Sequence, residues 1–217
     1  MIHDGLVSRT FPLIFAAPSG AGKTTLAREL GRRRFDVEFS VSATTRPARP
    51  GERDGIDYHF CSDEEFRSRI TAGELLEWAE VHGQLYGTPQ SNLVTAVDRR
   101  HFLLLDIDVQ GSRQVKSLVP EAVSIFVLPP DGEELAARLF GRGSEDPDRQ
   151  RRRLKAAREE IRSASEFDYV VINDDVDRAV EAIERIIAAE CLRPHRVESL
   201  DGYVAKLIGE IDAVLES

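Results

Sequence analysis

One stretch decides the fold of this chain: Ala17-Pro18-Ser19-Gly20-Ala21-Gly22-Lys23-Thr24. An apolar run, residues 11–16, comes directly before it, and a helical pattern that carries Leu26 and Leu30 follows. A strand, a glycine-rich turn and a helix in this order are the context of a phosphate-binding loop, or P-loop. The sequence therefore predicts an α/β fold that binds a nucleotide at this loop.

The residue types in the loop suit a polyphosphate. Gly20 and Gly22 let the backbone curl so that consecutive N–H groups point at an anion, and the helix N-terminus adds partial positive charge. Lys23 can reach the β- and γ-phosphates, and the Thr24 hydroxyl can coordinate Mg²⁺. We therefore expect ATP to contact nine consecutive residues: Ala17, Pro18, Ser19, Gly20, Ala21, Gly22, Lys23, Thr24 and Thr25.

The composition is that of one soluble globular domain. The 217 residues are 41% hydrophobic and 31% charged, and the net charge of −9 argues against general nucleic-acid binding. No apolar stretch approaches membrane-spanning length, and the N-terminus lacks the features of a secretory signal. The two cysteines, Cys61 and Cys191, fit no metal-binding spacing. We expect a cytoplasmic protein that binds neither nucleic acid nor membranes.

Apolar runs alternate with helical patterns, which predicts a parallel sheet flanked by helices. Strands are expected at residues 13–16, 102–107, 123–128 and 169–172. Helices are expected at residues 24–33, 110–118, 132–140, 147–165 and 177–190. The segment 35–93 breaks this rhythm and is interpreted as an inserted lobe with a small sheet and a helix at 63–72, capped by Ser62 and Glu65.

These patterns divide a single domain, residues 1–217, into parts. The core takes residues 8–34 and 94–191, the inserted lobe about 35–93, and a lid about 141–153. Apolar residues at helical spacing predict an amphipathic helix at about 199–216. Packing of this helix on its own subunit is the first expectation, and a subunit contact in a homodimer is the alternative.

A second constellation points to the phosphate acceptor. Arg46 and Arg49 are three residues apart and are locked by neighbouring prolines, so they form a rigid guanidinium pair. Such a pair suits bidentate recognition of a phosphate. Asp106 ends a buried apolar run, where a carboxylate that organises Mg²⁺ would lie.

With these residues the sequence resembles the guanylate kinases, which phosphorylate GMP with ATP. The resembling elements in the first half of the chain are the P-loop, the run from Ser42 to Tyr58, Glu77, Tyr86-Gly87-Thr88 and Asp106-Ile107-Asp108-Val109-Gln110-Gly111. Those in the second half are Pro129-Pro130, Arg138-Leu139-x-x-Arg142-Gly143, Arg153-Leu154 and residues 167–175. Ala17 replaces the first glycine of the general motif, as in bacterial members of the family.

The resemblance implies the fold of P-loop nucleoside-monophosphate kinases. That fold has a parallel core sheet flanked by helices, an inserted GMP-binding lobe and an arginine-rich lid. It also implies transfer of the γ-phosphoryl group of ATP to GMP, and to dGMP, with Mg²⁺ as cofactor. The products would be ADP and GDP, in purine nucleotide metabolism and GMP recycling.

The residues that match the family's GMP contacts are Ser42, Arg46, Arg49, Glu52, Tyr58, Glu77, Tyr86, Thr88 and Asp108. The two arginines and two tyrosines would hold the phosphate, and Glu52 would support the two arginines. Ser42, Glu77 and Thr88 would read the base. A carboxylate offers only acceptors, which suits guanine N1–H and the N2 amino group, whereas adenine has an acceptor at N1.

The resemblance also implies the catalytic groups, which are Lys23, Arg138, Arg142, Arg153 and Asp106. Cations placed in advance would meet the charge on the transferring group. Arg142 would lie in a lid whose closure excludes water. Thr24 would coordinate Mg²⁺, with Asp106 acting through water, and Asn173 would lie near the adenine end of ATP or the lid hinge.

Three other functions stay open. Another P-loop phosphotransferase, for thymidylate or a sugar phosphate, would not need Glu77 and the arginine pair. A GTPase switch would need Asn-Lys-x-Asp, which does not occur in the chain. A non-catalytic interaction domain related to guanylate kinase tends to lose the P-loop lysine and the phosphate arginines. This chain retains Lys23, Arg46, Arg49 and Arg142.

Overall fold

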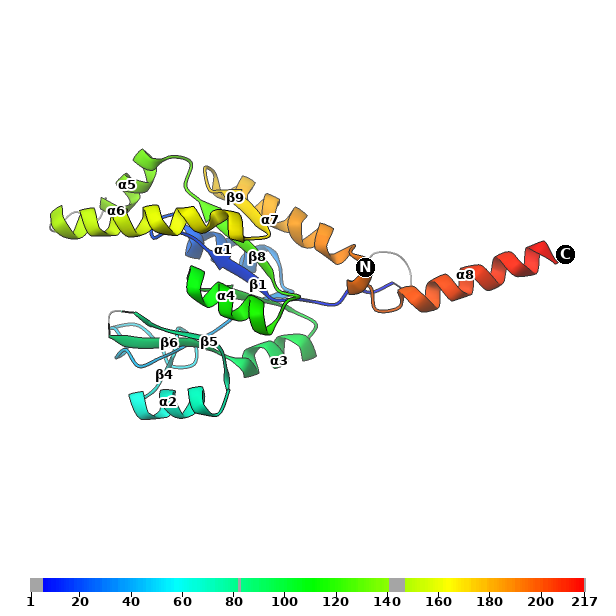
Figure 1. Cartoon of the computed structure of the whole chain (residues 1–217), viewed down its shortest axis with the longest axis horizontal. Helices are drawn as coiled ribbons and strands as arrows, with labels where there is room; N and C mark the ends of the chain where they lie inside the picture. The colour runs from blue at the N-terminus through cyan, green and yellow to red at the C-terminus, as the bar shows by residue number, and fades with distance from the viewer. Residues whose placement is uncertain (1–5, 82, 141–146, 217) are drawn as a thin grey trace. The chain divides into compact units, whose positions relative to one another are not determined.

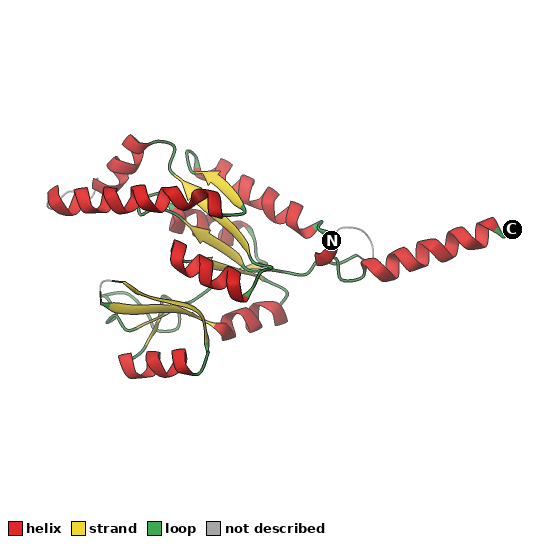
Figure 2. Ribbon diagram, in the orientation of Figure 1, coloured by secondary structure: helices red, strands yellow, loops and turns green. Residues whose placement is uncertain are grey.

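The computed structural model describes residues 6–81, 83–140 and 147–216. They divide into two compact units: one is Phe11–Val180, and the other combines the N-terminal residues up to Thr10 with those from Glu181 onward. Figure 1 follows the chain through its elements, and Figure 2 shows where helices and strands alternate.

The larger unit is built on a five-stranded parallel sheet with the strand order β2-β7-β1-β8-β9. Its strands are β1 (Leu13–Ala16), β2 (Val37–Phe39), β7 (Phe102–Asp106), β8 (Val123–Leu128) and β9 (Tyr169–Ile172). The three central strands are almost wholly buried, as continuous apolar runs in a parallel sheet require. The predicted parallel α/β sheet and its four predicted strands are therefore confirmed.

The edge strand β2 was not predicted. Val37, Glu38 and Phe39 pair in parallel with Phe102, Leu103 and Leu104 of β7. This strand therefore belongs to the core sheet, and the lobe boundary expected at residue 35 was too early. A strand of three residues is too short to produce a recognisable hydrophobic period.

Helices flank this sheet, most of them in the positions that the sequence predicts; the helix at Gln90–Asp98 was not predicted. The larger unit contains α1 (Lys23–Arg33), α3 (Gln90–Asp98), α4 (Val109–Leu118), α5 (Gly132–Phe140) and α6 (Pro147–Arg162). The helix expected to reach residue 165 ends earlier, because Ser163–Glu166 form a 3₁₀ turn. α5 and α6 lie side by side (Figure 1), with Leu135, Leu139 and Ala157 buried between them.

The inserted lobe has its own four-stranded sheet, in the order β4-β3-β6-β5. It consists of β3 (Ala43–Thr44), β4 (His59–Phe60), α2 (Asp63–Thr71), β5 (Leu75–Val81) and β6 (Gln84–Pro89). Phe66 of α2 is buried against Ala43 and Leu85 of this sheet. The predicted capping box is present, since Ser62 Oγ accepts from the Glu65 N–H and Glu65 Oε2 accepts from the Ser62 N–H.

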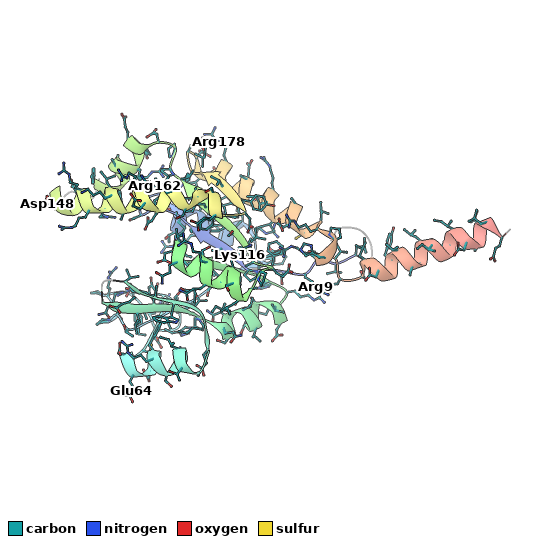
Figure 3. All side chains as sticks on the ribbon, in the orientation of Figure 1. Arg9, Glu64, Lys116, Asp148, Arg162 and Arg178 are labelled. Carbon is teal, nitrogen blue, oxygen red and sulfur yellow. The ribbon has the colours of Figure 1, made fainter. Side chains whose placement is uncertain are left out.

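Helix α4 joins the lobe to the core. It follows β7 in the chain, and it packs against both β1 of the core and β5 of the lobe (Figure 1). Asp108 caps its N-terminus by accepting from the Gly111 N–H at 2.7 Å. At its other end Lys116, labelled in Figure 3, donates to the Asp168 carboxylate and the Ala122 carbonyl. The C-terminal end of the helix is therefore anchored to the core, and its first turn is capped by Asp108.

The smaller unit contains the end of α7 (Val176–Cys191), a 3₁₀ turn at Pro194–Arg196 and α8 (Leu200–Leu215). Within it the Arg9 N–H donates to the Arg196 carbonyl at 2.7 Å, and the buried Arg196 and Glu190 side chains form an ion pair at 3.1 Å. The predicted C-terminal helix is confirmed, but none of its sixteen residues, all described, is buried.

Across the described residues, the structure has no helix of the length and apolar character needed to cross a membrane.

Candidate active site

The P-loop connects the end of β1 to the start of α1. Gly20 and Gly22 both have a φ of 89°, a conformation that a side chain disfavours. A Cβ at Gly22 would also collide with the Asn173 side-chain amide. Both glycines are therefore required by the shape of the loop, as the sequence predicts.

The loop forms one wall of a cavity of about 680 Å³. Of the ten predicted ATP contacts, eight line it: Ala17, Pro18, Ser19, Gly20, Gly22, Lys23, Thr24 and Thr25. Ala137 and Arg138 of α5 and Glu160 of α6 complete the described lining. The ninth predicted contact, Ala21, is buried, and its carbonyl faces Asn173.

Asn173 binds the backbone of the P-loop. Its buried side-chain Nδ2 donates to the Ala21 carbonyl at 2.7 Å, and the Arg138 guanidinium approaches both this carbonyl and that of Asn173 at 3.4 Å. Asn173 is not among the described residues that line the cavity. Its geometry corresponds to a residue that fixes the loop backbone, and the expected position near the adenine end of ATP or the lid hinge stays a prediction.

Lys23 and Thr24 both contact Asp106, which ends β7. Lys23 Nζ lies 2.5 Å from Asp106 Oδ1 and donates to the Ile107 carbonyl at 2.8 Å. Thr24 Oγ1 donates to Asp106 Oδ2 at 3.1 Å. A hydroxyl and a carboxylate are hard oxygen ligands that suit Mg²⁺. No group of three or more acidic, His or Cys side chains among the described residues could hold a metal, so water and phosphate oxygens would complete the coordination.

Two of the three predicted catalytic arginines lie at the P-loop or its cavity. Arg138 lines it and is bound by Glu134 at 2.8 Å. Arg153 of α6 donates from Nη2 to Ser19 Oγ at 3.1 Å. Arg142 lies outside the described residues.

Glu160 is a cavity residue that the sequence did not reveal. Its Oε2 accepts from the Ser19 N–H at 3.3 Å, and partial burial raises the pKa of its carboxyl group. The pair Glu159-Glu160 looks like an ordinary solvated helix surface in the sequence. Only the packing of α6 beside the P-loop brings this carboxylate to the phosphate-binding wall.

A second cavity, of about 240 Å³, opens between the lobe and the end of β7. Five of the nine predicted GMP contacts line it: Ser42, Tyr58, Glu77, Tyr86 and Asp108. Asp106 lines this cavity too, whereas its partner Lys23 lines the P-loop cavity. The two cavities therefore meet at the Lys23–Asp106 ion pair.

Glu77 lines the second cavity, and the buried Thr88 lies beside it. Glu77 is only 6% exposed, and the Thr88 hydroxyl donates to its Oε1 at 2.6 Å. Burial raises the pKa of Glu77 to about 7, and the nearby charge of Asp108 acts in the same direction. A buried carboxylate with few donors around it needs a ligand that brings donors of its own.

The arginine pair and its support are not among the described residues that line the second cavity, but Arg46 contacts Tyr58, which lines it. Glu52 Oε1 binds Arg46 Nη2 at 2.9 Å, and Glu52 Oε2 accepts from the Arg49 N–H at 2.7 Å. The hydrogen bond from Arg46 lowers the pKa of Glu52. The Arg46 guanidinium also lies over the Tyr58 ring, 5.3 Å from its centroid. The arrangement agrees with the expectation that Glu52 supports Arg46 and Arg49.

A P-loop cavity that meets a smaller cavity at a lysine–carboxylate pair is the layout of a kinase with a small acceptor. The fold and the site thus define a P-loop phosphotransferase, with one cavity on each side of Lys23 and Asp106.

The chain belongs to the guanylate kinase family, whose sequence model matches residues 9–190. It is 46% identical to the guanylate kinase of Chelativorans sp. over 199 residues, which cover 91% of each chain. It is 48% identical to that of Dechloromonas aromatica over 179 residues, 82% of this chain and 89% of the relative. The crystal structure of guanylate kinase from Anaplasma phagocytophilum matches with a TM-score of 0.74 at 37% identity, covering 91% of this chain and 94% of the other.

The raised pKa of Glu77 predicts a pH-dependent cost in stability. Because the folded-state pKa of about 7 lies above the ordinary value of 4.5, the unfolded chain releases this proton at lower pH than the folded protein does, and the free energy of unfolding falls as pH rises through this interval. The full effect at pH 8.5 is on the order of 3 kcal/mol. We expect Glu77→Gln to raise the Tm relative to wild type by several degrees at pH 8.5 and by much less at pH 5.

Thermal unfolding without nucleotides at the two pH values measures this effect. Glu80→Gln, an exposed neighbour on β5, is the matched control and should shift Tm equally at both. An equal shift for Glu77→Gln at pH 5 and 8.5 would contradict the prediction.

Proposed function

We propose that this chain transfers the γ-phosphoryl group of ATP to GMP, and to dGMP, to give ADP and GDP in purine nucleotide metabolism. The observation that carries the proposal is the buried Glu77 carboxylate in the smaller of two cavities that meet at Lys23 and Asp106. Membership of the guanylate kinase family supports the same activity.

Glu77 accounts for the choice of base. A carboxylate can accept from guanine N1–H and the N2 amino group together, and the bond from Thr88 holds it in place. Ser42 and Asp108 line the same cavity and offer further oxygen atoms. Adenine would present an acceptor at N1 and no amino group at C2, so the buried carboxylate would receive no hydrogen bond from the base, which is costly.

The acceptor phosphate is assigned to Arg46, Arg49, Tyr58 and Tyr86. Both tyrosines line the cavity, and burial raises the pKa of Tyr58, which keeps its hydroxyl protonated and able to donate. Glu52 holds Arg46 before the substrate arrives. A guanidinium fixed in this way loses less side-chain entropy when it binds a phosphate.

Phosphoryl transfer would take place where the two cavities meet. The P-loop N–H groups and Lys23 would hold the β- and γ-phosphates of ATP, and Arg138, Arg142 and Arg153 would stabilise the charge of the transferring group. Mg²⁺ held by Thr24, with Asp106 acting through water, would neutralise charge between the phosphates. The protein's own contribution is to place the cations and to align donor with acceptor.

An acceptor survey tests this function. With Mg²⁺ and ATP, a coupled assay of ADP release compares GMP with AMP, dTMP and sugar phosphates. We expect kcat/KM for GMP to exceed that for AMP by at least about a hundredfold. Equal use of AMP or dTMP would indicate another phosphotransferase, and slow GTP hydrolysis without need of GMP would indicate a switch. A chain that binds GMP but leaves it unconverted would be an interaction domain.

Lys23→Ala tests whether the donor and acceptor sites act separately. We expect kcat to fall by about a thousandfold, because a cation that meets the transferring charge is lost. The Kd for GMP, measured by calorimetry, should change by less than about threefold, since Lys23 lines only the donor cavity. Lys206→Ala, an exposed lysine of α8, is the control. Unchanged turnover in Lys23→Ala would contradict the assignment.

We also propose a cytoplasmic homodimer that involves neither nucleic acid nor membranes. Leu207, Ile208 and Ile211 of α8 remain exposed and lie at helical spacing, which supports a contact between copies. Sedimentation velocity should give a dimer of the 24.3 kDa chain, and Ile211→Glu should give a monomer. A wild-type monomer at micromolar concentration would contradict this assembly.

A further inference from the structure

The Glu77 side chain owes its direction to an irregularity in β5. Residues in a strand alternate between two faces, but Leu76 and Glu77 are both buried although they are adjacent. The pairing of β5 with β6 shifts register between Leu75 and Glu77, after which Glu77 pairs with Thr88. A bulge of this kind re-aims a side chain. Here it brings the Glu77 carboxylate against the first turn of α4.

Gly111 is the residue of α4 that faces this carboxylate. A Cβ built on Gly111 would lie 2.8 Å from Glu77 Oε2 and 3.3 Å from Glu77 Cδ, distances too short for an undisturbed contact. Gly111 is buried, helical and not among the glycines with positive φ. The backbone conformation at position 111 therefore does not require glycine, and alanine would stabilise the helix by up to about 1 kcal/mol. The lack of space beside Glu77 is what explains the glycine at this position.

Helix α4 has little freedom to move away from an added methyl group. Gln114, one turn after Gly111, pairs its side-chain amide with the backbone of Trp78, the residue next to Glu77. Oε1 accepts from the Trp78 N–H at 3.1 Å, and Nε2 donates to the Trp78 carbonyl at 2.9 Å. The Asp108 cap fixes the first turn of the helix. Both the helix and the strand that carries Glu77 are thus held at one separation.

The carboxylate itself is confined on its other side. The 2.6 Å bond from Thr88 fixes Oε1, so Oε2 stands in the space that Gly111 leaves open. A methyl group on residue 111 would push the carboxylate out of this position, because the hydrogen bonds between the Gln114 side chain and the Trp78 backbone keep α4 and β5 from moving apart.

We infer that Gly111 is a specificity-determining position for the acceptor base, and that Gln114 is a positioning residue that maintains the space around Glu77. The inference rests on the proposed function, because it takes Glu77 as the group that reads guanine. A displaced carboxylate can no longer meet guanine N1–H and the N2 amino group together. Phosphorylation of GMP should therefore suffer, while that of AMP, which gains nothing from Glu77, should not.

Gly111→Ala tests this inference against Gly31→Ala. Both changes place alanine in a helix, but no described atom lies within 4 Å of a Cβ added at Gly31 in α1. We expect Gly111→Ala to lower kcat/KM for GMP by about ten- to a hundredfold, mainly through KM, with kcat/KM for AMP within about twofold of wild type. Gly31→Ala should leave both values unchanged. The Tm of each variant shows whether the fold persists.

A double-mutant cycle with Glu77→Asp distinguishes a steric effect on the carboxylate from a general effect on α4. Aspartate withdraws its carboxylate from residue 111, so the added methyl should then cost less than about threefold in the Kd for GMP. In the wild-type background the same change should cost at least about tenfold. Equal costs in the two backgrounds would overturn the inference.

The remaining outcomes are also decisive. If Glu77→Gln leaves the GMP/AMP ratio of kcat/KM unchanged, the base-reading role of Glu77 fails and the inference fails with it. If Glu77→Gln narrows that ratio but Gly111→Ala does not, only the inference is wrong. Should Gly111→Ala fail to fold, recovery of the fold in Gly111→Ala/Glu77→Asp supports a clash with Glu77, whereas failure of both variants contradicts it.

Discussion

The ion pair between Lys23 and Asp106 is the contact around which the site is arranged. Lys23 follows β1, Asp106 ends β7, and the two strands are neighbours with Phe15 in register with Asp106. Because parallel strands place their carboxyl ends at one edge of the sheet, residues more than eighty positions apart meet there. Thr24 and the Ile107 carbonyl bind the same pair. Donor and acceptor cavities can share a boundary only because this pairing fixes β1 beside β7.

Much of this arrangement could be predicted where the signal is local. The P-loop glycines are predictable because the loop needs a φ near 89°, which glycine adopts readily. The central strands are predictable because each is an unbroken apolar run. The capping box at Ser62 and Glu65 depends on a spacing of three residues. The GMP contacts came from resemblance to a family, and the structure gathers five of them around one cavity. Their roles remain predictions that the proposed experiments address.

What the sequence did not reveal depends on tertiary packing. β2 is three residues long and is a strand because β7 pairs with it. Glu160 looks like helix surface until α6 lies beside Ser19. Asn173 follows a strand, and only the folded chain shows that its amide holds the Ala21 carbonyl. The roles of Gly111 and Gln114 likewise depend on their contacts with Glu77 and Trp78 of β5, a distant part of the sequence.

A common principle links the cations of this acidic protein. Before any substrate is bound, carboxylates already hold them: Asp106 holds Lys23, Glu52 holds Arg46, and Glu134 holds Arg138. Phosphate groups would therefore enter as replacements for carboxylates, and cations that are already oriented need little reorganisation during transfer. Glu77 is the reverse case, since it is an acidic group whose pKa is raised by burial and by the nearby charge of Asp108. Under the proposed function, donors on guanine would offset the cost of burying the Glu77 carboxylate, so base specificity and the loss of stability would have the same origin.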